Sequence, residues 1–148
     1  MQDLKDLTIN WDRCIYIDQP FNEELVKILT PEILSLRQKS NDPITIAINS
    51  VGGDVATIDT LIGLVKGPNQ DGKSCTAITV VTSHAYSAAA SLLALGDYAV
   101  AMPHSDILFH DTRYGRLQDV TPDAAKAAAK RLMSANERAS LRLNRPGF

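Results

Sequence analysis

The sequence contains no dense run of basic residues and carries little net charge. Its 148 residues include 15 Lys and Arg against 17 Asp and Glu, which gives a formal net charge of −2. Nucleic acids are bound largely through clustered positive charge, so this balance argues against a nucleic-acid partner. Long apolar runs are absent too. No stretch reaches the roughly 20 residues that a membrane span requires, so no membrane partner is expected.

The N-terminus lacks the apolar centre of a secretory signal. Met1–Trp11 is polar and acidic, which favours a cytoplasmic location. Cysteine is scarce, with only Cys14 and Cys75 in the chain, and both lie beside β-branched or aromatic residues typical of strand interiors. Their spacing matches no metal motif, and we expect two buried thiols rather than a disulfide.

Apolar residues, in contrast, are plentiful. They make up 45% of the chain, and a chain of this length can bury roughly 70% of its unfolded surface, so an ordinary domain with a substantial core is expected. From Arg13 onward short β-rich runs alternate with longer helical ones, which is typical of a layered α/β fold. No repeat or low-complexity segment interrupts this pattern. Residues 1–148 are therefore expected to form a single domain.

The alternating pattern predicts individual elements. Strands are expected at Cys14–Ile17, Ile44–Ile48, Cys75–Thr82, Tyr98–Met102 and Ile107–His110. Helices are expected at Asn22–Gln38, Val55–Lys66, Ser87–Leu95 and Thr121–Asn144. Pro31 suggests a kink or restart in the first helix, and Asp54 is placed to cap the second. One face of that second helix is expected to carry Val55, Ile58, Ile62 and Val65.

Gly67–Ser74 matches the phosphate-binding pattern G-x-x-x-x-G-K-S/T letter for letter. Such a loop binds phosphate when a strand enters it and a helix leaves it, because amides at the helix N-terminus complete the cradle. Here a predicted helix enters and a predicted strand leaves, and no later strand ends in an obvious magnesium-binding carboxylate. We therefore expect a solvated helix-to-strand loop, with nucleotide binding as the alternative.

Residues suited to serine chemistry gather in three places. Hydrolysis by a serine needs a hydroxyl on a rigid turn, a histidine to accept its proton and N–H groups aimed at the oxyanion. Ser87 lies at a predicted helix N-terminus, where negative charge is favoured, although a serine there also serves simply as a cap. Gly52–Gly53 offers unhindered amides after the neighbouring strand. His110, at the end of a predicted strand, is a candidate base.

Three segments resemble the proteolytic subunit of the Clp protease (ClpP) and its relatives within the ClpP/crotonase fold. Ile46–Val55 is similar to the family's INSPGG-x-V turn, Tyr86–Ala94 to its A-S-M-G-x-x-L-L-A nucleophile helix, and Met102–Asp111 to its P-N-S-x-I-M-I-H-Q strand. Their order and spacing match from Cys14 to about Leu143. The resemblance implies a spiral of β-α-β units with a protruding C-terminal handle helix at about residues 121–144.

The resemblance also implies roles for individual residues. Aligning Leu92–Ala94 with the family's L-L-A places the nucleophile on Ser87, rather than on Ser83 or Ser91. The same alignment assigns the general base and the two oxyanion-hole amides to His110, Gly53 and Ala88. It implies a serine endopeptidase of the ATP-dependent type, without metal or cofactor, that cleaves unfolded or extended polypeptides. Homo-oligomeric stacked rings and an ATP-driven unfoldase are the implied partners, and a substrate strand is expected to add to an exposed sheet edge beside the Gly52–Gly53 turn.

The sequence departs from the family pattern at several points. Val51 replaces a proline, His84–Tyr86 replaces Gly-x-Ala before the serine, and the segment between Ser87 and His110 is slightly shorter. The family's triad aspartate follows the handle helix, and none of the acids near it in this sequence matches that motif: Asp111, Asp119 and Asp123. Either the acid lies outside this sequence or the triad is incomplete. In the second case turnover is expected to be weak, because losing the orienting carboxylate costs on the order of 10⁴ in a serine protease.

Three alternatives stay open at this stage. The unmatched aspartate is compatible with a catalytically silent ClpP-like subunit that has a structural role. A crotonase-type acyl hydrolase or isomerase would use the same fold. A metal site could also be assembled from His104, Asp106 and His110.

Overall fold

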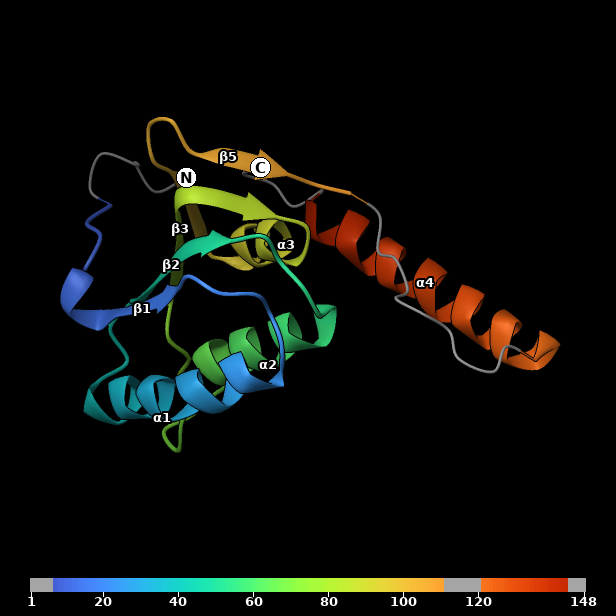
Figure 1. The fold of residues 1–148 in the computed structure, drawn as a ribbon. Helices are drawn as coiled ribbons and strands as arrows, with labels where there is room; N and C mark the ends of the chain where they lie inside the picture. Colours follow the sequence, from blue (N-terminus) through green and yellow to red (C-terminus); the bar gives the residue numbers. More distant parts are fainter. Residues whose placement is uncertain (1–6, 111–120, 144–148) are drawn as a thin grey trace.

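The computed structural model describes residues 7–110 and 121–143 (Figure 1). In chain order the elements are the 3₁₀ turn η2 (Trp11–Arg13), β1 (Cys14–Ile17), α1 (Glu23–Lys39), β2 (Ile44–Ser50), α2 (Val55–Lys66), β3 (Ala77–Tyr86), α3 (Ala88–Leu95), β4 (Tyr98–Ala101), β5 (Asp106–Leu108) and α4 (Pro122–Leu143). The strands pair in parallel in the order β1-β2-β3-β4, and β5 pairs with β3. The predicted α/β fold is confirmed.

β3 is the strand on which the sheet is organised. One side of it pairs with β2, and the other side pairs first with β4, through Ile78–Val81, and then with β5, through His84–Tyr86. The register with β2 shifts between Ile48 and Ser50, so β3 bulges near the end of β2. β3 therefore carries the chain from the middle of the sheet to the point where β2 and β5 both end.

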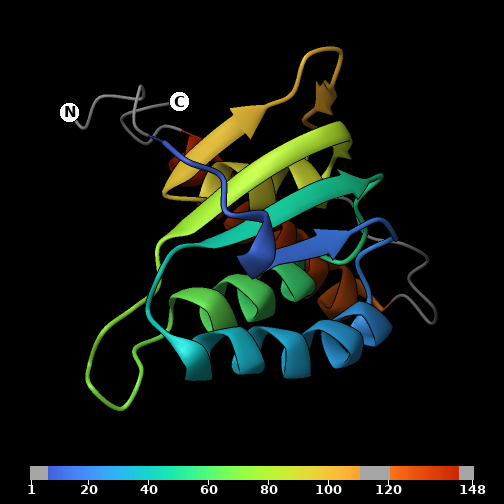
Figure 2. The ribbon, with the colours of Figure 1, turned by 90° about the vertical axis from the view of Figure 1, so that its left-hand side faces the viewer.

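The core lies between one face of the sheet and three helices. Figure 2 shows α1 and α2 side by side beneath the strands. Alternate residues of β1 and β2 point to this side, and Ile15, Ile46 and Ile48 are almost completely buried there. They form one cluster with apolar side chains of α1, α2 and α3, among them Leu25, Ile58 and Leu92. Burying such side chains is the main stabilising contribution to the fold.

Helices α1 and α2 begin as their sequences predict, but α1 is not interrupted. The side chain of Asn22 accepts a hydrogen bond from Leu25 N, and that of Asp54 accepts one from Ala56 N. The expected Asp54 cap is thus confirmed. The kink or restart expected at Pro31 is wrong, because α1 runs through it from Glu23 to Lys39. Pro31 is exposed, so the carbonyl that lacks an N–H partner lies on the solvent side of the helix.

Two buried arginines close the C-terminal ends of α1 and α2. The guanidinium of Arg13 donates to the carbonyl oxygen of Leu36 in the last turn of α1 and to those of Ser40 and Asp42 after its end. The guanidinium of Arg37 donates to the carbonyl oxygens of Leu64 and Gly67 at the end of α2. The last carbonyls of a helix lack partners within it, and the helix dipole favours a cation there. These contacts fix both helices against the sheet.

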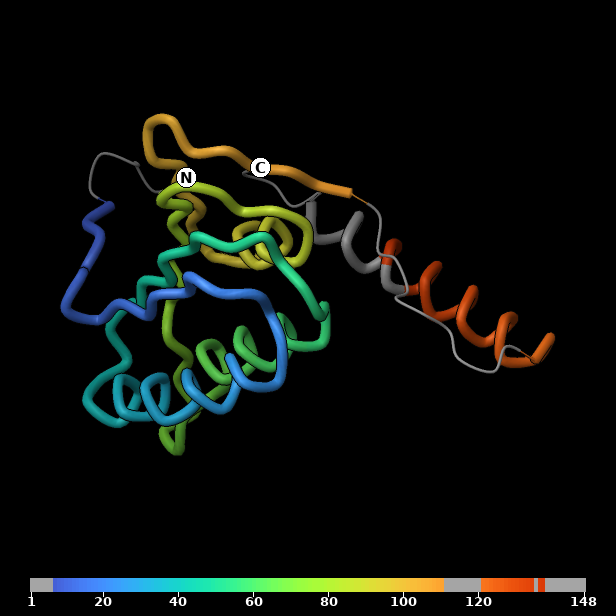
Figure 3. Tube along the Cα trace, in the orientation of Figure 1, coloured from blue at the N-terminus to red at the C-terminus, as the bar shows by residue number. Residues whose placement is uncertain are grey.

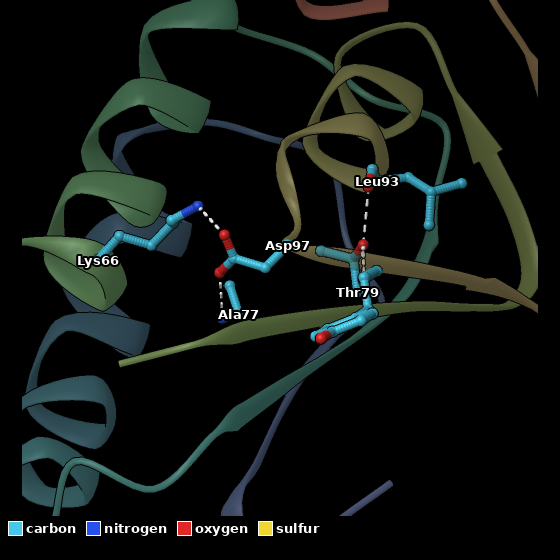
Figure 4. A network of polar contacts seen from close by, with 6 residues as sticks. Lys66, Ala77, Thr79, Leu93 and Asp97 are labelled. Atoms are coloured by element: carbon cyan, nitrogen blue, oxygen red, sulfur yellow. Dashed lines mark hydrogen bonds and ion pairs between the residues drawn. The ribbon is translucent and has the colours of Figure 1, made fainter. Parts of the chain in front are cut away.

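A second polar network joins α2, β3 and β4 (Figure 4). Asp97 accepts from Lys66 Nζ at 2.6 Å and from the N–H of Ala77 at 2.8 Å. The Thr79 hydroxyl donates to the carbonyl oxygen of Leu93 in α3 at 2.7 Å. The beginning of β3 is therefore held by its neighbours on both sides.

Several predicted boundaries are corrected by the structure. The third strand begins at Ala77 rather than Cys75 and continues past Thr82 to Tyr86, because its last residues pair with β5. β4 ends at Ala101, and β5 covers Asp106–Leu108, so His110 lies beyond the strand it was expected to end. The buried face of α2 consists of Thr57, Ile58, Leu61 and Val65, while Val55 and Ile62 are only partly buried.

The structure tests the expectation of two buried thiols. Cys14 and Cys75 are free, but only Cys75 is buried. Partial burial raises the pKa of the Cys14 thiol.

The Gly67–Ser74 loop joins α2 to β3, which confirms the order that argued against nucleotide binding. Its amides are also used internally, since Asn69 N donates to the carbonyl of Lys73 and Gly72 N to that of Asn69.

Helix α4 projects from the rest of the fold. In Figure 1 its N-terminal end lies furthest from the sheet. Its exposed side chains include Met133, which is 72% exposed, whereas Ala128 is buried. None of the helices in the described ranges is long and apolar enough to cross a membrane.

Candidate active site

Ser87 occupies a sharp turn between β3 and α3. Its backbone angles are φ 56° and ψ −121°, and its side chain makes no capping hydrogen bond to the helix. Among the described residues other than glycine, only Ser87 and His104 have positive φ. A residue with a side chain adopts such a conformation at a cost, which the surrounding structure must offset. A strained strand-to-helix turn of this kind presents a serine hydroxyl at the end of a sheet.

The backbone of Ser87 is held from both neighbouring elements. Its N–H donates to the carbonyl oxygen of Leu108 at 2.8 Å, and its carbonyl accepts from the N–H of Ser91 at 3.1 Å. The first bond ties the turn to β5, and the second starts α3. α3 is buried along nearly its whole length, so the turn cannot relax without displacing the helix from the core.

The Gly52–Gly53 turn lies directly against Ser87. Gly52 has φ 88° and Gly53 has φ 150°. A Cβ at Gly52 would stand 2.4 Å from the carbonyl oxygen of Tyr86, 2.9 Å from Ala88 N and 3.0 Å from Ser87 Cβ. Only glycine allows the two turns to approach this closely. The segments singled out from the sequence at positions 52–53 and 87–88 are therefore brought together.

The amide of Gly53 points away from the strand segment beside it. Phe21 forms a parallel bridge with Gly53, in which Phe21 N donates to Gly52 O and Asp54 N donates to Phe21 O. In a parallel bridge of this type the N–H and C=O of the central residue point to the other side. The bridge also corrects one expectation, because Phe21 occupies one side of the turn that was expected to be an open edge. The opposite side carries the Gly53 N–H.

Ala88 supplies a second amide near Ser87. It is the first residue of α3, and the first N–H groups of a helix have no partner within the helix. Together with the helix dipole they favour negative charge at this end. The amides of Gly53 and Ala88 thus belong to the residues that directly follow Gly52 and Ser87, the two residues in contact.

His110 follows β5 by two residues. β5 pairs with β3 so that Tyr86 lies opposite Leu108, which brings the segment after Leu108 alongside the turn at Ser87. Figure 3 shows this segment running along one margin of the molecule toward its end at position 110.

The rival serines are less suitable. The Ser83 hydroxyl does lie 3.4 Å from His84 Nδ1, but Ser83 is inside β3, away from a helix N-terminus and its amides. Ser91 is inside α3, where its N–H bonds to Ser87 O. Only Ser87 combines an uncapped hydroxyl with neighbouring helix and glycine-turn amides.

The acidic residues near the handle helix and the possible metal ligands add no support for a triad acid or for a metal site. Asp111 and Asp119 lie outside the described residues, and Asp123 is an exposed residue in the first turn of α4. Within 7–110 and 121–143 there is no group of three or more His, Cys, Asp or Glu side chains that could hold a metal ion. His104, Asp106 and His110 therefore do not form one.

Sequence reasoning missed a polar cluster next to the serine. Tyr86 Oη donates to Asp106 Oδ2 at 2.9 Å, and the His84 ring stacks obliquely on that of Tyr86, with centroids 5.0 Å apart. The carboxylate acceptor, followed by partial desolvation and the charge of Asp106, raises the pKa of the Tyr86 phenol. The signal available in the sequence was the replacement of the family's Gly-x-Ala by His84–Tyr86.

Comparisons with known proteins identify the family and the fold. The model of the Clp protease family matches residues 3–141. Among solved structures, a mutant of ClpP1 from Listeria monocytogenes is similar with a TM-score of 0.72 and 25% sequence identity, covering 88% of this chain and 70% of that one. No curated protein matches the chain. The fold predicted from the three segment likenesses is therefore confirmed.

Proposed function

Because the chain belongs to the Clp protease family, we propose that it is a serine endopeptidase that cleaves unfolded or extended polypeptides. The observation that carries the proposal is the backbone conformation of Ser87 at the β3–α3 turn. A strained, uncapped serine between helix amides and a double-glycine turn is a costly arrangement for a purely structural residue. Its cost is explained if the hydroxyl is the nucleophile.

The proposed mechanism uses four groups. Ser87 Oγ attacks the carbonyl carbon of the scissile peptide while His110 takes the hydroxyl proton. The N–H groups of Gly53 and Ala88 stabilise the oxyanion that forms. His110 then gives its proton to the leaving amine, the C–N bond breaks, and an acyl group remains on Ser87. Water, deprotonated by His110, releases the second peptide and restores the serine.

An extended substrate suits the open side of the Gly53 turn. The backbone groups of Gly53 that do not face Phe21 can pair with a peptide in β conformation, as in other cases of strand addition. Val51, at the same turn, is 57% exposed and apolar, and would contact a substrate side chain. A folded protein cannot present its backbone in this way, which favours unfolded polypeptides as substrates.

Assembly into stacked homo-oligomeric rings, served by an ATP-driven unfoldase, completes the proposal. It rests on family membership and on α4, a projecting helix with exposed apolar surface. Exposed apolar surface of this kind is commonly covered by a partner. A closed chamber would also allow only polypeptides that have already been unfolded to reach the nucleophile.

Labelling with a fluorophosphonate probe tests the proposal, combined with turnover of a short fluorogenic peptide. Wild-type protein should be labelled and active, and Ser87→Ala should abolish both while the far-UV circular dichroism is unchanged. Ser83→Ala and Ser91→Ala are matched controls and should keep both properties. Labelling or turnover that persists in Ser87→Ala would contradict the assignment.

One alternative gains support from a specific observation. In the sequence, none of Asp111, Asp119 and Asp123 matches the motif of the family's aspartate, which is compatible with a catalytically silent subunit of a mixed ring. Absence of labelling in wild-type protein, with the fold intact, would favour that alternative. Labelling with turnover of small thioesters but not peptides would instead favour a crotonase-type acyl hydrolase.

A further inference from the structure

The segment that carries His110 begins with the strand β5. β5 (Asp106–Leu108) is three residues long, and all three are exposed. It pairs with β3 from His84↔Asp106 to Tyr86↔Leu108. Pairings this short are marginal in water unless side chains support them. Since His110 follows two residues later, whatever holds β5 on β3 also sets the position of His110 relative to Ser87.

A side-chain hydrogen bond links the two strands at this place. Tyr86 Oη donates to Asp106 Oδ2 at 2.9 Å. The two residues are not directly opposite, because Asp106 pairs with His84 and Tyr86 pairs with Leu108. The bond therefore runs diagonally between the strands. A diagonal bond resists sliding of β5 along β3 more than a direct cross-strand contact would.

The Tyr86 ring is itself supported. His84 and Tyr86 lie on the same face of β3, since successive strand residues alternate and Ala85 between them is buried. Their rings are 5.0 Å apart at an angle of 37°. This contact limits the positions that the phenol can take. The hydroxyl is thereby aimed at Asp106.

We infer that Tyr86 and Asp106 are positioning residues, whose hydrogen bond keeps β5 in register so that His110 stands beside the nucleophile. This inference rests on the proposed function. Tyr86 directly precedes Ser87, and Ser87 N–H donates to Leu108 O. The Tyr86–Asp106 bond and the proposed nucleophile therefore both lie where β3 and β5 end. The family pattern has alanine at the position of Tyr86, which cannot form this bond. The Tyr86–Asp106 hydrogen bond is therefore not part of the family pattern.

A double-mutant cycle on peptide turnover tests the inference. Tyr86→Phe and Asp106→Ala, which leave no phenol donor and no side-chain acceptor respectively, should each lower kcat about five- to tenfold with KM changed less than about twofold, because substrate binding does not involve the bond. The double variant should be no slower than the slower single variant, since both remove the same interaction. Tyr16→Phe, an exposed tyrosine on β1, is the matched control and should leave kcat unchanged.

The imidazole signal of His110 in proton NMR gives a readout that does not require turnover. Its resonance, assigned with His110→Gln, should move in Tyr86→Phe and in Asp106→Ala. Tyr16→Phe should leave it in place. Should Tyr86→Phe fail to fold, Asp106→Ala carries the test, because Asp106 is exposed.

The outcomes separate the two proposals. Unchanged kcat and an unchanged His110 signal in both variants would overturn the positioning role, while the proposed function stands if Ser87 is still required. Activity that survives Ser87→Ala would overturn the proposed function instead. In that case the His110 signal alone decides whether Tyr86 and Asp106 position the histidine.

Discussion

Gly52 and Ser87 are in direct backbone contact, so closely that a Cβ at position 52 would stand 3.0 Å from Ser87 Cβ. Two strained turns, one after β2 and one after β3, are packed against each other at this place. Each turn limits the movement of the other. The geometry around the candidate nucleophile thus depends on both turns together.

Substituting Gly52 should therefore destabilise the whole protein. Gly52→Ala adds a Cβ at 2.4 Å from the carbonyl oxygen of Tyr86 and at φ 88°, so we expect a loss of at least about 2 kcal/mol in the free energy of unfolding. Gly63→Ala is the matched control, since Gly63 lies in α2 with nothing within 4 Å of an added Cβ. That variant should be stabilised by up to about 1 kcal/mol. Urea denaturation measures both, and equal effects would contradict the contact.

Arg37 should matter more for stability than its neighbour Lys39. Arg37→Met removes the guanidinium that bonds the carbonyls of Leu64 and Gly67 and leaves them buried without donors. We expect a loss of about 2–4 kcal/mol in the free energy of unfolding. Lys39→Met, at an exposed position in the same helix, should change it by less than about 0.5 kcal/mol. A similar stability for the two variants in thermal melts would show that α2 does not need this cap.

The phenol of Tyr86 should titrate above its ordinary range. Its hydrogen bond to Asp106 stabilises the protonated phenol and raises its pKa. Asp106→Asn should lower that pKa toward the ordinary value of about 10, followed by the ultraviolet absorbance of tyrosinate with Tyr86→Phe as the reference. Because the folded pKa is the higher one, the bond stabilises the fold below about pH 10 and this contribution is lost as pH rises through the folded pKa. An unchanged midpoint in Asp106→Asn would refute the interaction.

Helix α4 should be required for assembly. Met133 is 72% exposed on this projecting helix, and a charge there would oppose burial against a second copy. Met133→Glu should shift the mass measured by light scattering toward the monomer, whereas Glu137→Gln, at an exposed position on the same helix, should not. A deletion of the residues after Val120 should have at least the effect of Met133→Glu. A wild-type monomer at micromolar concentration would exclude the ring.

Much of the fold was predictable because its elements have strong local signals. β1 was predicted with the bounds that the structure has, and Asp54 was correctly expected to cap α2. The error at Pro31 arose because local propensity does not reveal that the proline is on the exposed side of a helix that packs only one face against the core. The end of β3 was missed because residues 83–86 are small or polar, and they form a strand through pairing with β5 and, at Ala85, with β2.

The sequence could point to the segments that the structure brings together, but not to the contacts between them. Glycines after β2 and a serine before an Ala-rich helix could be identified from spacing and resemblance. The bridge from Phe21 and the Tyr86–Asp106 bond could not, because both join segments that are distant in sequence. Single-sequence patterns describe the faces of elements and carry no information on which loop approaches which.

The parallel arrangement of the sheet also bears on the order of folding. Ser87 adopts its conformation only when three separate segments meet: the turn at Gly52, the beginning of α3, and the carbonyl of Leu108 on β5. Each parallel pairing must close a long crossover first, and loop closure delays contacts that are distant in sequence. Ser87, the proposed nucleophile, should therefore acquire its geometry among the last steps of folding. If the proposed function holds, a nascent or partly folded chain has a serine at position 87 that is still unreactive, which protects neighbouring unfolded polypeptides until the fold is complete.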